Sequence, residues 1–109
     1  MTSERFDNLT EETFNKVITT LGVKKNEYTP KLDRLANFKS AAKLQNETPI
    51  EALGGMLAKH VISVYDYISR SAEGEYISID SWDEKIIDVI NYMILLRGLV
   101  EEHNNMVTD

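Results

Sequence analysis

Residues 81–100 read SWDEKIIDVINYMILLRGLV, a helix-length stretch that is apolar on nearly every side. Isoleucine, leucine, valine and methionine recur at helical spacing, so little of this helix can face water. Glu84, Asp88 and Asn91 interrupt the pattern, and their spacing of four and three residues places them on one line. We call this line the acidic seam. Because an unpaired charge in apolar surroundings is costly, the seam requires a partner, a metal ion or water.

The N-terminal half of the chain predicts two helices. Residues 9–21 place their apolar side chains on a shared face, with Asn8 as the cap and Gly22 as the stop signal. A second helix is expected over residues 30–44, because Thr29 and the proline after it are typical of a helix start.

The C-terminal half predicts two longer helices. Thr48 and Glu51 form a capping box around a proline, which opens a helix that extends to about residue 71. Ser81 and Glu84 have the same spacing and are expected to open the last helix. The linker between these helices contains a glycine and is predicted to be a loop. Short connections favour antiparallel neighbours, so the predicted fold is all-α, an antiparallel bundle of about four helices.

Length and composition limit the class of protein. The chain has 109 residues, a size typical of one domain, so a single helical domain over residues 1–109 is expected. It has no cysteine, which excludes disulfides, zinc fingers and thiol catalysis. No apolar run has the length of a membrane span, and the first residues do not form a signal peptide. We therefore expect a cytoplasmic protein that does not bind membranes.

The charge distribution argues against general DNA binding, because the net charge is −6 and such binding depends on basic side chains. Residues 1–46 contain 8 basic and 6 acidic side chains, whereas residues 47–109 contain 4 basic and 12 acidic ones. A solvated surface explains this split. An anionic ligand held between a basic helix and an acidic, metal-binding helix would explain it as well.

Polar side chains also follow the edge of the apolar stripe on the third predicted helix. Lys59, His60 and Asp66 form this margin, which could be one wall of a cleft. Each residue also has a structural interpretation: His60 as a hydrogen-bonded histidine at the core edge, and Lys59 and Asp66 as a solvated pair.

Two cations lie on or beside the apolar stripe of the second predicted helix. Lys31 and Arg34 are near its start, where a positive charge opposes the helix dipole. Their stems could lie along the apolar surface with the charges in water. Alternatively, a counter-anion neutralises them, either a carboxylate of this chain or a ligand phosphate.

Glu84 and Asp88 are one helical turn apart, a spacing that permits shared binding of Mg²⁺ or Mn²⁺. The same residues have a structural alternative. Glu84 could serve as the capping partner of Ser81, and Asp88 could pair with Lys85 or Arg34.

The run LDRLANFKSAAKLQNETPIEALGGMLAKHVISVYDYI, followed by SWDEKIIDVINYMILL, resembles small phage-encoded MazG-like proteins. The resemblance covers about residues 30–100 and implies a MazG-like core at about 30–104. Members of the MazG family are all-α nucleoside triphosphate pyrophosphohydrolases that bind Mg²⁺ through acidic residues on two helices. Glu84 and Asp88 match the family's last motif, E-E-x-x-D, with Lys85 in place of the second Glu. The other motif, E-E-x-x-E, has no counterpart on the preceding helix.

The resemblance implies a role for each candidate residue. Metal binding is expected at Glu84, Asp88 and Asp66. Phosphate or nucleotide binding is expected at Lys31, Arg34, Lys59 and Asn91, with Asn91 orienting a water or a base. His60 is the expected proton donor, and Lys59 is expected to be a second catalytic residue. The protein would then be a Mg²⁺-dependent nucleotide-binding protein that splits a nucleoside triphosphate between its α and β phosphates.

Two alternatives remain. The protein could be a non-catalytic phage protein that uses the same cleft to sequester a nucleotide signal, or that binds a host protein in the host cytoplasm. The absence of the E-E-x-x-E motif favours a non-catalytic protein. The apolar fourth helix could instead serve only as an oligomer interface. In the MazG family the active site is commonly completed by oligomerisation, so a homo-oligomer is expected under the first interpretation too.

Overall fold

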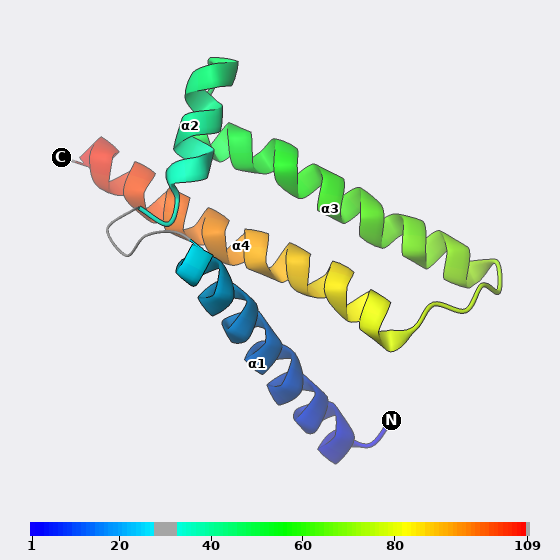
Figure 1. Cartoon of the computed structure of the whole chain (residues 1–109). Coiled ribbons are helices and arrows are strands. Elements are labelled where there is room, and N and C mark those ends of the chain that lie inside the picture. Colours follow the sequence, from blue (N-terminus) through cyan, green and yellow to red (C-terminus); the bar gives the residue numbers. More distant parts are fainter. Residues whose placement is uncertain (28–32, 109) are drawn as a thin grey trace. The chain divides into compact units, whose positions relative to one another are not determined.

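The computed structural model describes residues 1–27 and 33–108 (Figure 1). The described residues form four α-helices, which confirms the predicted all-α class and helix number. The helices are α1 (Ser3–Glu27), α2 (Ala36–Gln45), α3 (Pro49–Ala72) and α4 (Ile79–Thr108). The chain divides into two compact units, Met1–Leu32 and Asp33–Asp109, so α1 lies in the first unit and the other helices lie in the second. The prediction of one domain stays a prediction.

Helix α1 is longer than the predicted 9–21 at both ends. The Oγ1 atom of Thr2 accepts a hydrogen bond from the backbone N–H of Arg5 at 3.1 Å, so Thr2 caps the helix and Asn8 lies inside it. Gly22 does not end the helix, which continues through it to Glu27. A glycine within a helix costs only about 1 kcal/mol, which the neighbouring turns can offset.

Helix α2 begins later than predicted. Residues 28–32, which include Thr29 and Lys31, lie outside the described residues. Asp33 forms a turn, with its Oδ1 atom accepting from the N–H of Leu35 at 2.9 Å, and the helix begins at Ala36. The prediction that residues 33–35 are helical is therefore wrong, because the aspartate side chain satisfies a backbone donor outside the helix.

Helix α3 begins at the predicted capping box. The N–H of Glu51 donates to Thr48 Oγ1, and the N–H of Thr48 donates to Glu51 Oε1, both at 3.1 Å. Pro49 occupies the first turn, where it has no hydrogen bond to lose. The predicted start is confirmed, and the predicted end near residue 71 agrees with Ala72.

Replacing Thr48 with alanine should lower the free energy of unfolding by about 1 kcal/mol, because one donor of the first turn loses its acceptor. Chemical denaturation of both proteins at neutral pH measures this difference.

The pKa of Glu51 is lowered by the hydrogen bonds from the backbone and side chain of Thr48. A lowered pKa stabilises the fold above the ordinary value of 4.5, and this contribution is lost as the pH falls through the lowered value. Glu51→Gln should therefore destabilise the protein at neutral pH, and its effect should disappear as the pH falls below the lowered pKa of Glu51.

Helix α4 begins at Ile79, two residues before the predicted cap. Ser78 is the capping side chain, since its Oγ atom accepts from the N–H of Ser81 at 3.2 Å. The prediction that Ser81 and Glu84 form a capping box is therefore wrong, because Ser78 supplies the acceptor one turn earlier. Capping does not explain the carboxylate of Glu84.

Helices α3 and α4 form an antiparallel hairpin, as predicted. Leu53 contacts Leu99, His60 contacts Tyr92, and Tyr67 contacts Trp82, so residue numbers rise along α3 as they fall along α4. Helix α2 packs across the end of this hairpin that is far from its loop (Figure 1).

The core of the hairpin unit lies at the end where α2 packs. Phe38 of α2 is buried against Leu53 and Leu99, and its ring meets the edge of the Tyr92 ring at a centroid distance of 6.1 Å. Leu53 is 0% exposed. This packing fixes the register of α3 against α4 and therefore the positions of the side chains along the rest of the hairpin.

The two helices give the hairpin two unlike sides. Successive residues lie about 100° apart around a helix. In an antiparallel pair, residues that are displaced from the line of contact in the same direction of rotation lie on the same side of the pair. One side, here called the seam side, carries Lys59 and Ser63 of α3 together with the acidic seam of α4. Helix α2 packs on this side, because Leu35 comes within 3.5 Å of the Cβ position at Gly98.

The other side of the hairpin, here called the apolar side, carries only apolar residues. The row on α3 is Leu57, Val61, Tyr65 and Ile68. The row on α4 is Ile86, Val89, Met93, Leu96 and Val100. Every member of the two rows is exposed or half-buried in the structure.

Candidate functional site

The acidic seam meets α3 at His60. The Nδ1 atom of His60 lies 3.6 Å from Oδ2 of Asp88, and both side chains are about one-third exposed. The imidazole also lies against the Tyr92 ring, with a centroid distance of 4.6 Å and planes inclined by 32°. His60 is therefore positioned by an aromatic ring on one side and a carboxylate on the other. At 3.6 Å the contact with Asp88 is too long for a hydrogen bond, and it becomes an ion pair when the imidazole is protonated.

Asn91 is the most unusual residue of the seam. Its side chain is 0% exposed, and neither its amide nitrogen nor its amide oxygen has a hydrogen-bond partner. A buried amide without partners costs about 1–3 kcal/mol, so such groups are rare in folded proteins. The sequence predicts the position of Asn91 on the seam but not this burial.

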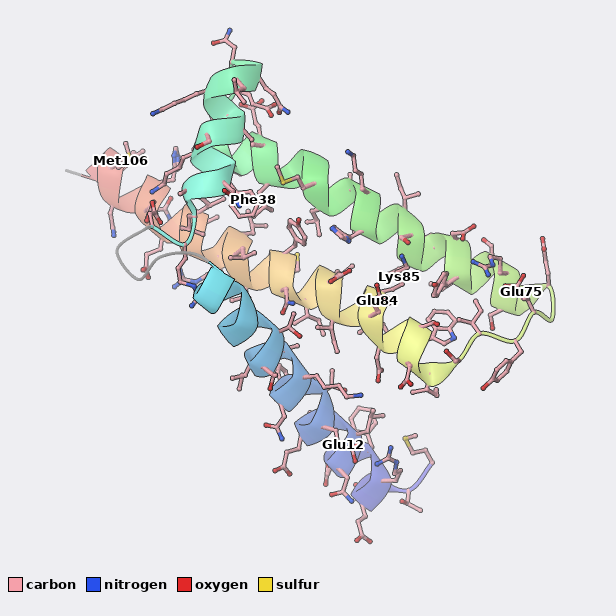
Figure 2. The ribbon with its side chains drawn as sticks, in the orientation of Figure 1. Glu12, Phe38, Glu75, Glu84, Lys85 and Met106 are labelled. Atoms are coloured by element: carbon pink, nitrogen blue, oxygen red, sulfur yellow. The ribbon has the colours of Figure 1, made fainter. Side chains whose placement is uncertain are left out.

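Glu84 begins the acidic seam on the first turns of α4, and Lys85 is its neighbour in the sequence (Figure 2). Glu84 is exposed, and among the described residues it has no hydrogen bond or ion pair. Lys85 lies over the ring of Tyr67, with Nζ 5.5 Å from the centroid. The side chain of α3 next to Asp88 is His60. The ammonium of Lys85, which the sequence offered as a partner for Asp88, lies over Tyr67 instead.

Asp66 does not form a group with the carboxylates of Glu84 and Asp88. It is exposed and pairs with Arg70 at 3.3 Å, one turn further along α3, and Arg70 also binds Glu75. Within residues 1–27 and 33–108, no group of three or more His, Asp or Glu side chains is placed to hold a metal ion. Two carboxylates one turn apart fit Mg²⁺ only if phosphate oxygens and water complete its coordination, which is a common arrangement for this ion.

The predicted phosphate-binding cations Lys59 and Arg34 lie on different elements of the structure. Lys59 is exposed and lies on the seam side of α3. Arg34 is exposed in the turn before α2. Lys31 lies outside the described residues.

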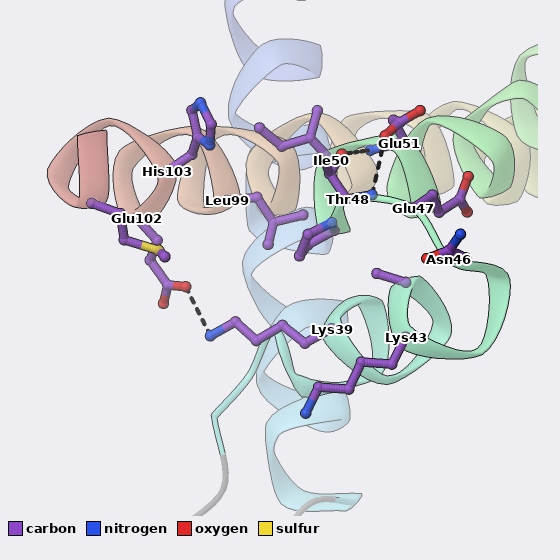
Figure 3. Close-up of a pocket in the computed structure, with 13 residues that line it drawn as sticks. Lys39, Lys43, Asn46, Glu47, Thr48, Ile50, Glu51, Leu99, Glu102 and His103 are labelled. Carbon is purple, nitrogen blue, oxygen red and sulfur yellow. Dashed lines mark hydrogen bonds and ion pairs between the residues drawn. The ribbon is translucent and has the colours of Figure 1, made fainter.

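A separate hollow of about 1180 Å³ is formed by α2, the start of α3 and the end of α4 (Figure 3). Its floor contains apolar residues such as Leu99 and Ile50, and its rim carries charges of both signs. None of the acidic seam residues lines it. Lys39 on the rim is an ion-pair residue that the sequence did not single out. It binds Asp33 and lies 2.8 Å from Glu102.

The seam is the stronger candidate of the two places. In the hollow, Lys39 is paired with the carboxylates of Asp33 and Glu102, which raise its pKa. Thr48 and Glu51 form hydrogen bonds with each other at the start of α3. At the seam, the buried amide of Asn91 has no partner at all. An unsatisfied buried group indicates a missing ligand or water more directly than the size of a hollow does.

Comparison with family models, with curated proteins and with solved structures finds no match to this chain. Among the described residues, no helix combines the length and apolar character that crossing a membrane requires.

Proposed function

We propose that this protein binds a nucleoside triphosphate together with Mg²⁺ on the seam side of the α3–α4 hairpin and acts on it as MazG-like proteins do. The observation that supports the proposal most strongly is Asn91, whose buried amide has a donor and an acceptor without partners next to Asp88 on the helix. A nucleobase or an ordered water offers the complementary donor and acceptor. Because Asn91 is covered, binding must be accompanied by a rearrangement that uncovers it.

The carboxylates of Glu84 and Asp88 would hold Mg²⁺, or Mn²⁺ in its place, while the phosphates of the nucleotide supply further oxygen ligands. When bound, the ion would neutralise charge on the phosphates and help to polarise the α-phosphorus. Lys59 would contact the phosphates from α3 on the same side of the hairpin. Arg34, in the turn before α2, is proposed as a further phosphate contact. Lys31 lies outside the described residues, and its role stays a prediction.

In the proposed reaction, a water molecule attacks the α-phosphorus and the bond from this atom to the oxygen bridging the α and β phosphates breaks. The products are a nucleoside monophosphate and pyrophosphate. Protonated His60 can donate a proton to the leaving pyrophosphate, and Asp88 lies 3.6 Å from its Nδ1 atom. The Tyr92 ring holds the imidazole in place beside the seam.

A second candidate function is binding without hydrolysis, to sequester a nucleotide or to bind a host protein. The observation that favours it is the position of Asp66, which pairs with Arg70 and does not complete a group of three acidic ligands within the described residues. A site with two carboxylates holds a metal ion less firmly than one with three or four.

Incubation of the purified protein with each common NTP and dNTP in the presence of Mg²⁺ or Mn²⁺, followed by phosphorus NMR, distinguishes the candidates. We expect monophosphate and pyrophosphate from at least one nucleotide, and no reaction with Asp88→Ala. Glu101→Ala is the matched control, because Glu101 is an exposed acid of the same helix in a surface ion pair with Arg97. Intact nucleotides that nevertheless bind would favour sequestration. The absence of binding to every nucleotide would contradict both nucleotide proposals.

A further inference from the structure

Two cations gather at the loop end of the α3–α4 hairpin, and the proposed reaction uses neither of them. The ammonium of Lys85 lies 5.5 Å from the centre of the Tyr67 ring, and the guanidinium carbon of Arg70 lies 5.1 Å from the same centre. The Tyr67 ring is held by an edge-to-face contact with Trp82, at a centroid distance of 5.5 Å. This aromatic pair therefore holds two positive groups at one place, near the start of the acidic seam.

The two cations differ in how their charges are balanced. Arg70 is paired with the carboxylates of Asp66 and Glu75. Lys85 is half-buried, and within residues 1–27 and 33–108 no carboxylate pairs with it. The Tyr67 ring attracts the ammonium, but it carries no net charge that would neutralise it. Lys85 is therefore a half-buried cation without a counter-anion.

The head group of Lys85 lies in line with the other contacts between α3 and the acidic seam. His60 and Tyr67 are seven residues apart on α3, so they lie on one line of this helix. Asp88 contacts His60, and Lys85 contacts Tyr67. The ammonium of Lys85 is therefore near the same line, about two helical turns closer to the hairpin loop.

The neighbour of Lys85 in the sequence, Glu84, also carries a charge without a partner in the described part of the chain (Figure 2). Successive residues point in directions about 100° apart, so these two opposite charges do not face each other. Unpaired charges of both signs fit a ligand that contains both. A complex of Mg²⁺ with a polyphosphate is such a ligand, because carboxylates bind the ion and ammonium groups bind phosphate oxygens.

We infer that Lys85 binds the terminal phosphates of the nucleotide and makes the site select triphosphates over monophosphates. This inference rests on the proposed function and adds to it the residue that distinguishes the length of the phosphate chain. Asn91, the proposed base contact, follows Lys85 by six residues, or about 9 Å along the helix axis. The base and the terminal phosphates would thus lie at different levels of α4, with the metal ligand Asp88 between them.

Lys85 would also act in the proposed reaction. The terminal phosphates leave as pyrophosphate when the bond to the α-phosphorus breaks. A fixed ammonium at these phosphates would stabilise the negative charge that develops on the leaving group.

Binding of matched nucleotides to the full-length protein tests this inference. The probes are the α,β-methylene analogue of each common nucleoside triphosphate, which the proposed reaction cannot split, and the corresponding monophosphate, both with Mg²⁺. In Lys85→Met the affinity for the analogue should fall by about tenfold to a hundredfold, because a charge-assisted contact is lost. The affinity for the monophosphate should stay the same, because this ligand lacks the phosphates that Lys85 contacts.

Two further variants serve as controls. Lys85→Arg retains the positive charge and should keep the preference for the triphosphate analogue. Lys43→Met removes the same charge from an exposed residue of α2 that has no ion-pair partner among the described residues, and it should leave both affinities unchanged. Thermal unfolding of each variant checks that it folds.

An equal loss of affinity for both ligands in Lys85→Met would overturn the inference, since it would indicate a structural role of the cation beside Tyr67. An unchanged affinity for the analogue would also contradict it, while the proposed function would stand. If the wild-type protein binds no nucleotide, the proposed function fails, and a titration with inorganic pyrophosphate and Mg²⁺ decides the role of Lys85. Pyrophosphate binding that is lost in Lys85→Met would support the phosphate site. Pyrophosphate that does not bind, or that binds equally to the variant, would refute it.

Discussion

Replacing Asn91 with leucine should increase the free energy of unfolding by about 1–2 kcal/mol, because it removes a buried donor and acceptor that have no partners and leaves a side chain of similar size. Most substitutions of buried residues destabilise proteins, so an increase is a specific expectation. The same substitution should abolish nucleotide binding. Chemical denaturation and a nucleotide titration of one variant measure the two effects.

A matched control for this substitution is Asn15→Leu, which changes an exposed asparagine on α1 and should alter stability by no more than about 0.5 kcal/mol. A loss of more than 1 kcal/mol in Asn91→Leu would show that the amide makes stabilising hydrogen bonds in solution. A gain in stability with unchanged nucleotide binding would place the ligand elsewhere.

Leu53→Ala should reduce the free energy of unfolding by about 3–4 kcal/mol, because it leaves a cavity in the core of the hairpin unit. Leu53 is 0% exposed and contacts Phe38 of α2 and Leu99 of α4, so its removal leaves a cavity among three helices. For a small domain with about 5–10 kcal/mol of stability, this is a large fraction of the total.

The matched control for Leu53→Ala is Leu44→Ala, since Leu44 is a helical leucine of α2 that is 88% exposed. It should change stability by less than about 0.5 kcal/mol. Urea denaturation of both variants, with the slope compared to wild type, measures the difference. Equal effects of the two substitutions would contradict the position of the core.

The helices could be predicted in number and type because their apolar residues recur at helical spacing. Their starts were harder to predict. Thr2 rather than Asn8 caps α1, and Ser78 rather than Ser81 caps α4. Several serine, threonine and asparagine side chains near a helix start can cap it with similar free energies, so sequence alone does not select among them. The start of α3 was predicted correctly because Thr48, a proline and a glutamate all indicate the same residue.

The line of Glu84, Asp88 and Asn91 could be predicted because it depends only on the spacing within one helix. The contact between Asp88 and His60 could not, since it depends on the register between two helices, which the packing around Leu53 sets. The complete burial of Asn91 also depends on tertiary packing. For the same reason, spacing alone could not show that Asp66 would pair with Arg70 rather than approach the seam.

The side-chain amide of Asn91 tests the central proposal most directly. In ¹⁵N-labelled protein its NH₂ resonances are identified by their absence from the spectrum of Asn91→Leu. If the amide contacts the ligand, these resonances should shift when a nucleoside triphosphate is added with Mg²⁺, and Asp88→Ala should prevent the shift. Asn91 resonances that stay unchanged at saturating nucleotide would contradict a nucleotide site at the acidic seam.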